Sequence, residues 1–204
     1  MIKSQSFTTR QAMRQTGNLD PMAPSYFPVN LGRSWTYRSV TRHTVGDVLI
    51  EETSSIERER IEGVTPLSQP IGDAQWAVSV SHDVAQTDKT HEHYTTQLLL
   101  SETSVREASA PTFLTTDLSW EGVSEDGLTV YRHTAQDGVS TDVLAGVFGD
   151  CRLVTEVAMQ GDVVLYQKQD WYAAGVGRVR SAFTQDSALG LYTEQRELIA
   201  SKAE

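Results

Sequence analysis

The sequence predicts an all-β protein built on a single, highly curved antiparallel sheet, as a half-barrel or barrel of about nine strands. Apolar and polar residues alternate over long stretches, as expected for strands with one buried face. Glycine-containing turns separate these stretches at the spacing of β-hairpins. Helical periodicity is rare and leaves room for one or two short helices. Because open sheet edges invite aggregation, a sheet of this size is expected to curl or close.

The clearest evidence comes from residues 144–183, which predict three consecutive antiparallel strands. From Cys151 onward, alternate positions separate into two faces. Gly161 then supplies the positive φ of a tight hairpin turn. The second strand, 163–172, is rich in β-branched and aromatic residues. The glycines in 175–177 indicate a bend or bulge before the third strand.

Two parts of the chain are distinguished. Residues 1–24 are polar and end in a cluster of glycine and proline, so we interpret them as a flexible N-terminal arm. Such an arm is either a disordered tail or a segment that docks on another subunit. Residues 25–204 are predicted to form the antiparallel β domain, since their turns and alternating stretches continue without interruption.

Several features guide the reading of this domain. The alternating charges of 57–60 are interpreted as the water-exposed part of a long hairpin. Proline and glycine indicate a loop at 63–73, and 101–110 is compatible with a short helix that Pro111 ends. The remaining predicted strands are 35–40, 48–61, 75–84, 91–102, 118–123, 128–134 and 191–201. A turn is predicted at 136–138, after which 139–144 leads into the stretch 144–183.

Composition limits the classes of function. The 204 residues carry a net charge of −10, which disfavours binding to nucleic acid and to anionic lipid. The single cysteine, Cys151, excludes an intrachain disulfide and is interpreted as a buried thiol. The first 24 residues contain no apolar run, so no signal peptide and no membrane span are predicted. The chain as written is expected in the cytoplasm, or in the periplasm or envelope if a leader has been removed.

Three segments, taken together, resemble a known group of proteins. They are YFPVNLGRSWTY at 26–37, AGVFGDCRLVTEV at 145–157 and WYAAGVGRVRSAF at 171–183. They are similar to segments of poorly characterised bacterial envelope proteins and lipoproteins. The resemblance implies a curved antiparallel sheet of the LolA-like, lipoprotein-carrier kind, and it implies an architecture rather than an activity.

Histidines provide the one candidate for metal binding. His91 and His93 lie two positions apart on a predicted strand, so their rings share a face, and His82 or Asp83 on the neighbouring strand offers a third ligand. We favour exposed strand histidines instead, because a metal site needs converging ligands with supporting hydrogen bonds. No metal, no cofactor and no catalytic motif is therefore predicted, and the chain is expected not to be an enzyme.

Aromatic residues are the remaining candidates for binding. If the sheet curves without filling its hollow, they line a pocket for an apolar ligand, whereas dense packing makes them a core. We favour the core but retain the pocket. The residues are Trp35, Tyr37, Trp76, Tyr94, Trp120, Trp171 and Tyr172.

Three hypotheses of function follow from these features. The first is a non-enzymatic binding or accessory subunit that holds a protein partner, or another copy of itself. It would do so through the N-terminal arm and a sheet edge or the concave face. The alternative is a carrier of a lipid or other apolar molecule in the concave aromatic face. The third is a metal-dependent enzyme around His91 and His93.

Overall fold

The computed structural model describes residues 26–87, 90–108 and 110–203, so the predicted N-terminal arm lies outside the described residues. The described residues form twelve strands and no helix, which confirms the all-β class and corrects the predicted count of about nine. None of them therefore forms a helix able to cross a membrane. The strands are β1 (Ser34–Val45), β2 (Val48–Ile71), β3 (Ala74–Gln86), β4 (His91–Leu100), β5 (Ser104–Glu107), β6 (Thr112–Thr115), β7 (Ser119–Val123), β8 (Val130–Val143), β9 (Gly146–Gln160), β10 (Val163–Ala173), β11 (Gly177–Ser187) and β12 (Gly190–Lys202).

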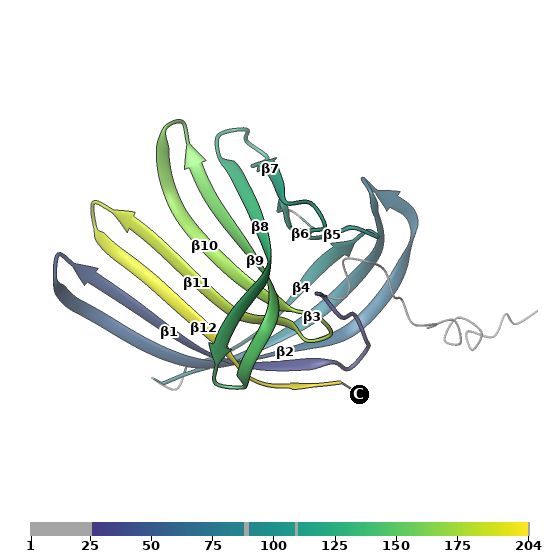
Figure 1. Ribbon diagram of the computed structural model, residues 1–204, viewed down its shortest axis with the longest axis horizontal. Coiled ribbons are helices and arrows are strands. Elements are labelled where there is room, and N and C mark those ends of the chain that lie inside the picture. The colour runs from purple at the N-terminus through teal and green to yellow at the C-terminus, as the bar shows by residue number, and fades with distance from the viewer. Residues whose placement is uncertain (1–25, 88–89, 109, 204) are drawn as a thin grey trace, which may run out of the picture.

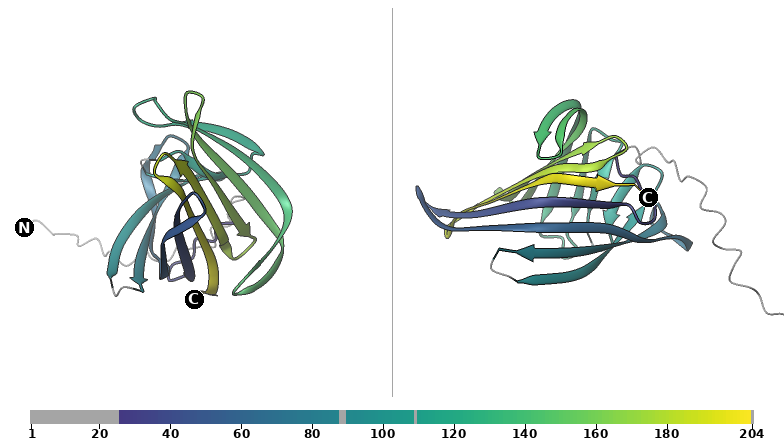
Figure 2. Two further views of the ribbon diagram at one scale, coloured as in Figure 1. Left: turned by 90° about the vertical axis from the view of Figure 1, so that its left-hand side faces the viewer. Right: turned by 90° about the horizontal axis from the view of Figure 1, so that it is seen from below.

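All twelve strands belong to one antiparallel sheet, in the order β6-β5-β4-β3-β2-β1-β12-β11-β10-β9-β8-β7. Strands that follow each other in the chain pair with each other, except β6 and β7, and β1 pairs with β12, so that the first and last strands join in the middle of the sheet. The two edges, β6 and β7, are consecutive in the chain. The sheet curls until these edges approach each other, which nearly closes it into a barrel (Figures 1 and 2).

Side chains bridge the seam between β6 and β7. Trp120 Nε1 donates a hydrogen bond to the carbonyl oxygen of Thr112 at 2.7 Å. Gly122 faces Pro111 so closely that an added Cβ at Gly122 would lie 2.6 Å from the Pro111 Cβ. Within the described residues no backbone ladder joins the two strands, so the absence of a side chain at Gly122 lets the edges approach.

Replacing Gly122 by Ala is therefore expected to lower the free energy of unfolding by about 1 to 3 kcal/mol, the usual cost of overpacking. Urea unfolding monitored by circular dichroism measures this change. Gly149→Ala is the matched control, because an added Cβ there meets no atom within 4 Å. If both variants unfold at the same urea concentration, the seam is not tightly packed at Pro111.

Two strands are longer than the sequence predicts, because irregularities in their register let them continue. The predicted loop at 63–73 is instead largely a continuation of β2, whose register shifts between Ile61 and Gly63 and again between Pro66 and Ile71. Such irregularities accommodate proline, which cannot donate to a regular ladder. The turn predicted at 136–138 is likewise part of one strand, β8, whose register is irregular between Gln136 and Thr141.

The helix predicted at 101–110 is wrong, and β5 occupies part of this segment. Leu100 of β4 pairs with Val105 of β5, and the Ser101 and Ser104 hydroxyls lie 2.8 Å apart in the turn between them. Val105 is 1% exposed, so tertiary burial overrides the weak helical preference of this polar segment. β6, which pairs with β5, was missed because it has only four residues.

The beginning of β1 packs against the turn between β10 and β11. The Trp35 indole nitrogen donates to the carbonyl oxygen of Val176 at 2.6 Å, and the Tyr37 hydroxyl donates to that of Arg178 at 3.0 Å. Arg33 reaches the carbonyl oxygen of Gly175 at 2.5 Å. Two of the three segments that carry the sequence resemblance, 26–37 and 171–183, therefore pack directly against each other.

The core lies on the concave face of the sheet. Tyr37, Val78 and Tyr172 are each 1% exposed or less. Cys151 is 0% exposed, which confirms the predicted buried thiol, and burial raises the pKa of that thiol. The core does not fill the concavity, and the space that it leaves is the candidate site.

Candidate functional site

The curved sheet encloses a cavity of about 250 Å³. One wall comes from β1 to β4 and the other from β8 to β11, while residues of β5, β6 and the loop between them form a lip. Four aliphatic side chains contribute to the lining, those of Val80, Leu98, Ala110 and Pro111. Most of the apolar lining is aromatic, with rings from Phe27, Trp35, Tyr37, Phe113, Tyr131, Tyr166 and Tyr172.

Three of the seven aromatic residues expected from the sequence line this cavity: Trp35, Tyr37 and Tyr172. The other four do not. Tyr94 stacks on His82 and Trp120 stacks on His133, with centroid distances of 4.5 and 4.7 Å. Trp171 lies beneath the guanidinium group of Arg180, and Trp76 packs against the edge of the core. These four are packing residues of the sheet rather than walls of the cavity.

A buried network of charges forms one side of the cavity. Glu59 Oε1 accepts hydrogen bonds from Arg178 Nη2 at 2.9 Å and from Arg196 Nη2 at 2.7 Å. Arg196 also pairs with Glu57 at 3.0 Å, and its guanidinium group lies 4.0 Å from the ring centroid of Tyr37. Each glutamate is 8% exposed, so the water-exposed interpretation of 57–60 is wrong for these two residues.

Strand alternation explains this burial. Glu57 and Glu59 occupy the same face of β2 as Ile61, which is fully buried, whereas Arg58 and Arg60 point the other way. Burial disfavours the ionised form of Glu59, but attraction by Arg196 and Arg178 outweighs it. Together these effects lower the pKa of Glu59 from 4.5 to about 2.

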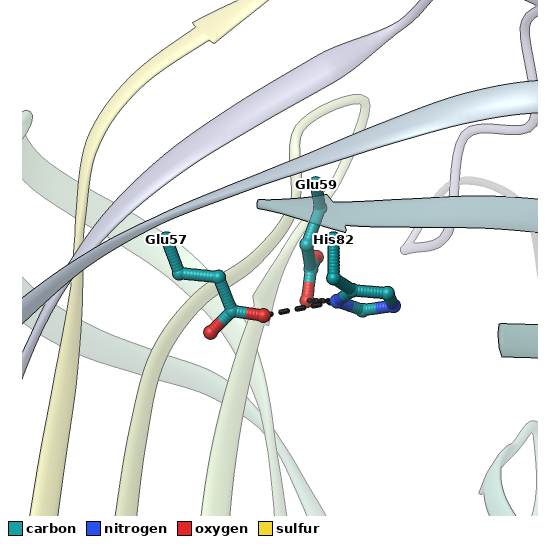
Figure 3. Close-up of side chains that lie close together, drawn as sticks. All are labelled: Glu57, Glu59 and His82. Carbon is teal, nitrogen blue, oxygen red and sulfur yellow. Dashed lines mark hydrogen bonds and ion pairs between the residues drawn. The ribbon is translucent and has the colours of Figure 1, made fainter. Parts of the chain in front are cut away.

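His82 joins the network from β3, as Figure 3 shows. Its Nδ1 lies 2.9 Å from Glu57 and 3.7 Å from Glu59, and its Nε2 lies 2.8 Å from Thr96 Oγ1. Because an ionised carboxylate only accepts hydrogen bonds, Nδ1 carries a proton. Nε2 and the Thr96 hydroxyl share the second hydrogen bond, so both ring nitrogens are engaged.

Glu57, Glu59 and His82 are the described residues that could hold a metal ion, since their ligand atoms lie within 4.8 Å of one another. The charges around them argue against this use. Arg178 and Arg196 already neutralise the two carboxylates and would repel a cation. The cluster therefore fits an ion-pair network better than a metal centre.

The predicted grouping of His91, His93 and His82 needs correction. In the β3–β4 register, His93 lies opposite Asp83 and His82 lies opposite Tyr94. Adjacent positions on a strand face opposite sides, so His82 points into the interior while Asp83 points outward. His93 Nδ1 lies 2.9 Å from the carboxylate of Asp83, which is half-buried, whereas His93 and His91 are exposed. His82 is 8% exposed, which corrects its interpretation as an exposed strand histidine.

A second polar cluster lines the opposite wall. Glu156 accepts hydrogen bonds from the Tyr166 hydroxyl at 2.8 Å and from His133 Nε2 at 2.7 Å. Burial raises the pKa of Glu156, but these hydrogen bonds outweigh it and lower the pKa overall. Lys168 Nζ lies 3.0 Å from Asp170, which is 5% exposed. Each buried charge on this wall is therefore held by a specific partner.

Sequence reasoning missed all the charged residues of the site. One signal was present, because Lys168, Asp170 and Tyr172 alternate along β10 and so share a face. The residues that could not be found are the partners far away in the chain. Arg178 and Arg196 follow Glu59 by more than a hundred positions and meet it because β1 pairs with β12.

A larger hollow of about 560 Å³ lies near the turns of the β1–β2 and β11–β12 hairpins. Its lining is mainly hydroxyl and amide side chains, including Thr41, Ser54 and Gln185, with one aromatic ring, Tyr192. Its lining contains fewer aromatic rings than that of the interior cavity, and apolar, aromatic walls are typical of small-molecule sites. The aromatic cavity is therefore the stronger candidate.

Comparisons with known proteins place the fold. No family model matches the chain, and no curated protein sequence matches it. A Bacteroides fragilis protein with a YmcC-like fold, provisionally described as exported, is similar in structure with a TM-score of 0.53 and 13% identity, over 87% of this chain and 99% of that one. At this identity the likeness shows the fold alone, a YmcC-like curved antiparallel sheet.

Two further structures are more distant. A Parabacteroides distasonis protein, provisionally described as a lipoprotein, has a TM-score of 0.47 and 12% identity, over 87% of this chain and 98% of that one. An S-type phycobiliprotein lyase from Guillardia theta has a TM-score of 0.35 and 11% identity, over 86% of this chain and 90% of that one. The curved sheet implied by the sequence resemblance is confirmed, whereas the LolA-like assignment stays a prediction.

Proposed function

We propose that the chain is a non-enzymatic binding protein that holds a small amphipathic molecule in its interior cavity. One observation carries this proposal: a space of about 250 Å³, whose apolar lining is mostly aromatic, remains inside the curved sheet. Protein interiors are close-packed, and sizeable voids cost stability. A cavity that combines apolar walls with a few placed polar groups is typical of a ligand site.

This proposal favours the second hypothesis from the sequence, a carrier of an apolar molecule, in a modified form. The charged network of Glu59 and Arg178 and the hydrogen-bonded Glu156 border the same cavity as the aromatic rings. A purely apolar ligand would leave these groups facing hydrocarbon, which is costly. The ligand is therefore expected to have both an apolar body and polar atoms.

Filling the cavity tests the proposal. Val80 lines it and is 4% exposed, so Val80→Phe is expected to occupy ligand space and to abolish binding. Native mass spectrometry of protein purified from its own cells measures the bound mass, and circular dichroism confirms that the variant folds. Val147→Phe, at a site 72% exposed, is the control and should bind as the unmodified chain does. Retention of the ligand by Val80→Phe would contradict the cavity as the site.

A second candidate function, holding a protein partner, is favoured by the hairpin tips. The β1–β2 and β11–β12 tips are adjacent, and they expose Val48, Leu49 and Leu189 at 62%, 52% and 80%. Asp47 and Asp186 lie beside these residues, so a partner with apolar and basic side chains fits. Since the net charge of −10 opposes self-association, light scattering should report a monomer. A dimer that dissociates on Leu49→Asp would show that the partner is a second copy.

A further inference from the structure

We infer that the ligand of the interior cavity is an uncharged, flat, ring-containing molecule with hydrogen-bonding substituents, and not an acyl chain or an ion. This inference rests on the proposed function, because it concerns the chemistry of the same site. Three properties of the walls support it: their shape, the state of their charges and their remaining hydrogen-bonding capacity.

Flat surfaces dominate the apolar walls. Seven aromatic rings line the cavity against four smaller aliphatic side chains, those of Val80, Leu98, Ala110 and Pro111. Phe27 and Trp35 stack at a centroid distance of 6.4 Å with their planes 28° apart, so they present broad faces. Aromatic faces pack best against other flat rings, whereas a flexible chain gains more from aliphatic walls and loses more entropy on binding. The shape therefore favours a ring.

The permanent charges of the first wall are already compensated. Glu59 binds Arg178 at 2.9 Å, and Glu57 binds Arg196 at 3.0 Å, so two carboxylates match two guanidinium groups. The Arg196 guanidinium also covers the Tyr37 ring at 4.0 Å. An ionic ligand would find no uncompensated opposite charge there, yet it would have to give up its hydration.

The charged groups of the second wall also have partners. Lys168 pairs with Asp170 at 3.0 Å, and the Glu156 carboxylate accepts from both His133 and Tyr166. A cation at Glu156 would compete with these two donors, and an anion at Lys168 would compete with Asp170. Both walls therefore disfavour a charged head group.

Hydrogen-bonding capacity nevertheless remains. The Tyr172 ring lines the cavity and is 1% exposed, and its hydroxyl can donate a hydrogen bond. Lys168 Nζ, which also lines the cavity, has three donor hydrogens and pairs with Asp170. A hydroxyl or carbonyl oxygen on a neutral ring can accept from these groups without introducing a charge. The inferred ligand class combines these features.

A matched set of small molecules tests the inference by equilibrium dialysis against the purified chain. 2-Naphthol is the neutral ring, 2-naphthoate the anion, 2-naphthylmethylammonium the cation and 1-decanol the neutral chain. 2-Naphthol is expected to bind at least about tenfold more tightly than each of the others. Tyr172→Phe should weaken it by about 2- to 10-fold, the range for one lost hydrogen bond, and Val80→Phe should abolish its binding.

Each alternative binding result contradicts either the inferred ligand class or the proposed function. Tighter binding of 2-naphthoate or 2-naphthylmethylammonium, lost in Val80→Phe, would show a charged ligand class and leave the cavity as the site. Tighter binding of 1-decanol, lost in the same variant, would replace the ring by an acyl chain. If none of the four binds, or if Val80→Phe changes nothing, the proposed function fails together with the inference.

Discussion

Replacing Glu59 by Gln is expected to lower the free energy of unfolding by about 3 to 5 kcal/mol, as when one partner of a buried ion pair is removed. Glu59 is 8% exposed and accepts hydrogen bonds from two guanidinium groups, those of Arg178 and Arg196. The amide of glutamine keeps the shape but not the charge. The variant therefore leaves two buried cations with one carboxylate fewer to balance them, and that uncompensated charge is the cost.

Urea unfolding at neutral pH measures this loss. Glu121→Gln is the matched control, because Glu121 forms a 3.0 Å ion pair with Arg132 while both side chains are mostly exposed, at 63% and 60%. Exposed pairs contribute about 0 to 1 kcal/mol, so the control should change little. Equal and small losses in the two variants would show that the Glu59 network is hydrated rather than buried.

Lowering the pH is expected to remove the contribution of the Glu59 carboxylate to the free energy of unfolding. The pKa of Glu59 falls from 4.5 to about 2 on folding, so the unfolded chain binds more protons between these values. Its contribution is fully present above pH 4.5 and is lost as the pH falls towards 2. Because one unit of pKa difference corresponds to about 1.4 kcal/mol, this contribution amounts to about 3 kcal/mol.

Urea unfolding between pH 6 and pH 2 tests this linkage. The difference in stability between the unmodified chain and Glu59→Gln should shrink as the pH falls, because both then carry a neutral side chain at this position. Asp170 and Glu156 also have lowered pKa values, so the variant should keep part of its acid sensitivity. A difference that stays constant over this range would mean that Glu59 is not held in its ionised form by Arg178 and Arg196.

Much of the sheet could be predicted from the sequence, because alternation and glycine turns are local signals. The β9–β10 and β10–β11 hairpins lie where residues 144–183 place them, and Trp35 and Tyr37 enter the interior as expected. Local signals gave wrong predictions where contacts with other strands determine the secondary structure. The four-residue β5 carries a helix-compatible sequence but is fixed by pairing with β4.

The site was harder to predict for the same reason. Alternation shows that Glu57 and Glu59 share a face, but it does not say which face is inside, and charged residues are usually exposed. Their burial depends on guanidinium groups from β11 and β12, which no local pattern connects to β2. Ile61, two positions beyond Glu59 on the same face, was the available hint.

The most direct test of the central claim is a crystal structure of the chain purified from its own cells. We predict electron density for a small molecule between the two walls, in contact with Trp35 and Tyr172, inside the cavity of about 250 Å³. A structure in which Phe27 and Phe113 close onto the opposite wall and fill this space would contradict the account, because no ligand could then be held there.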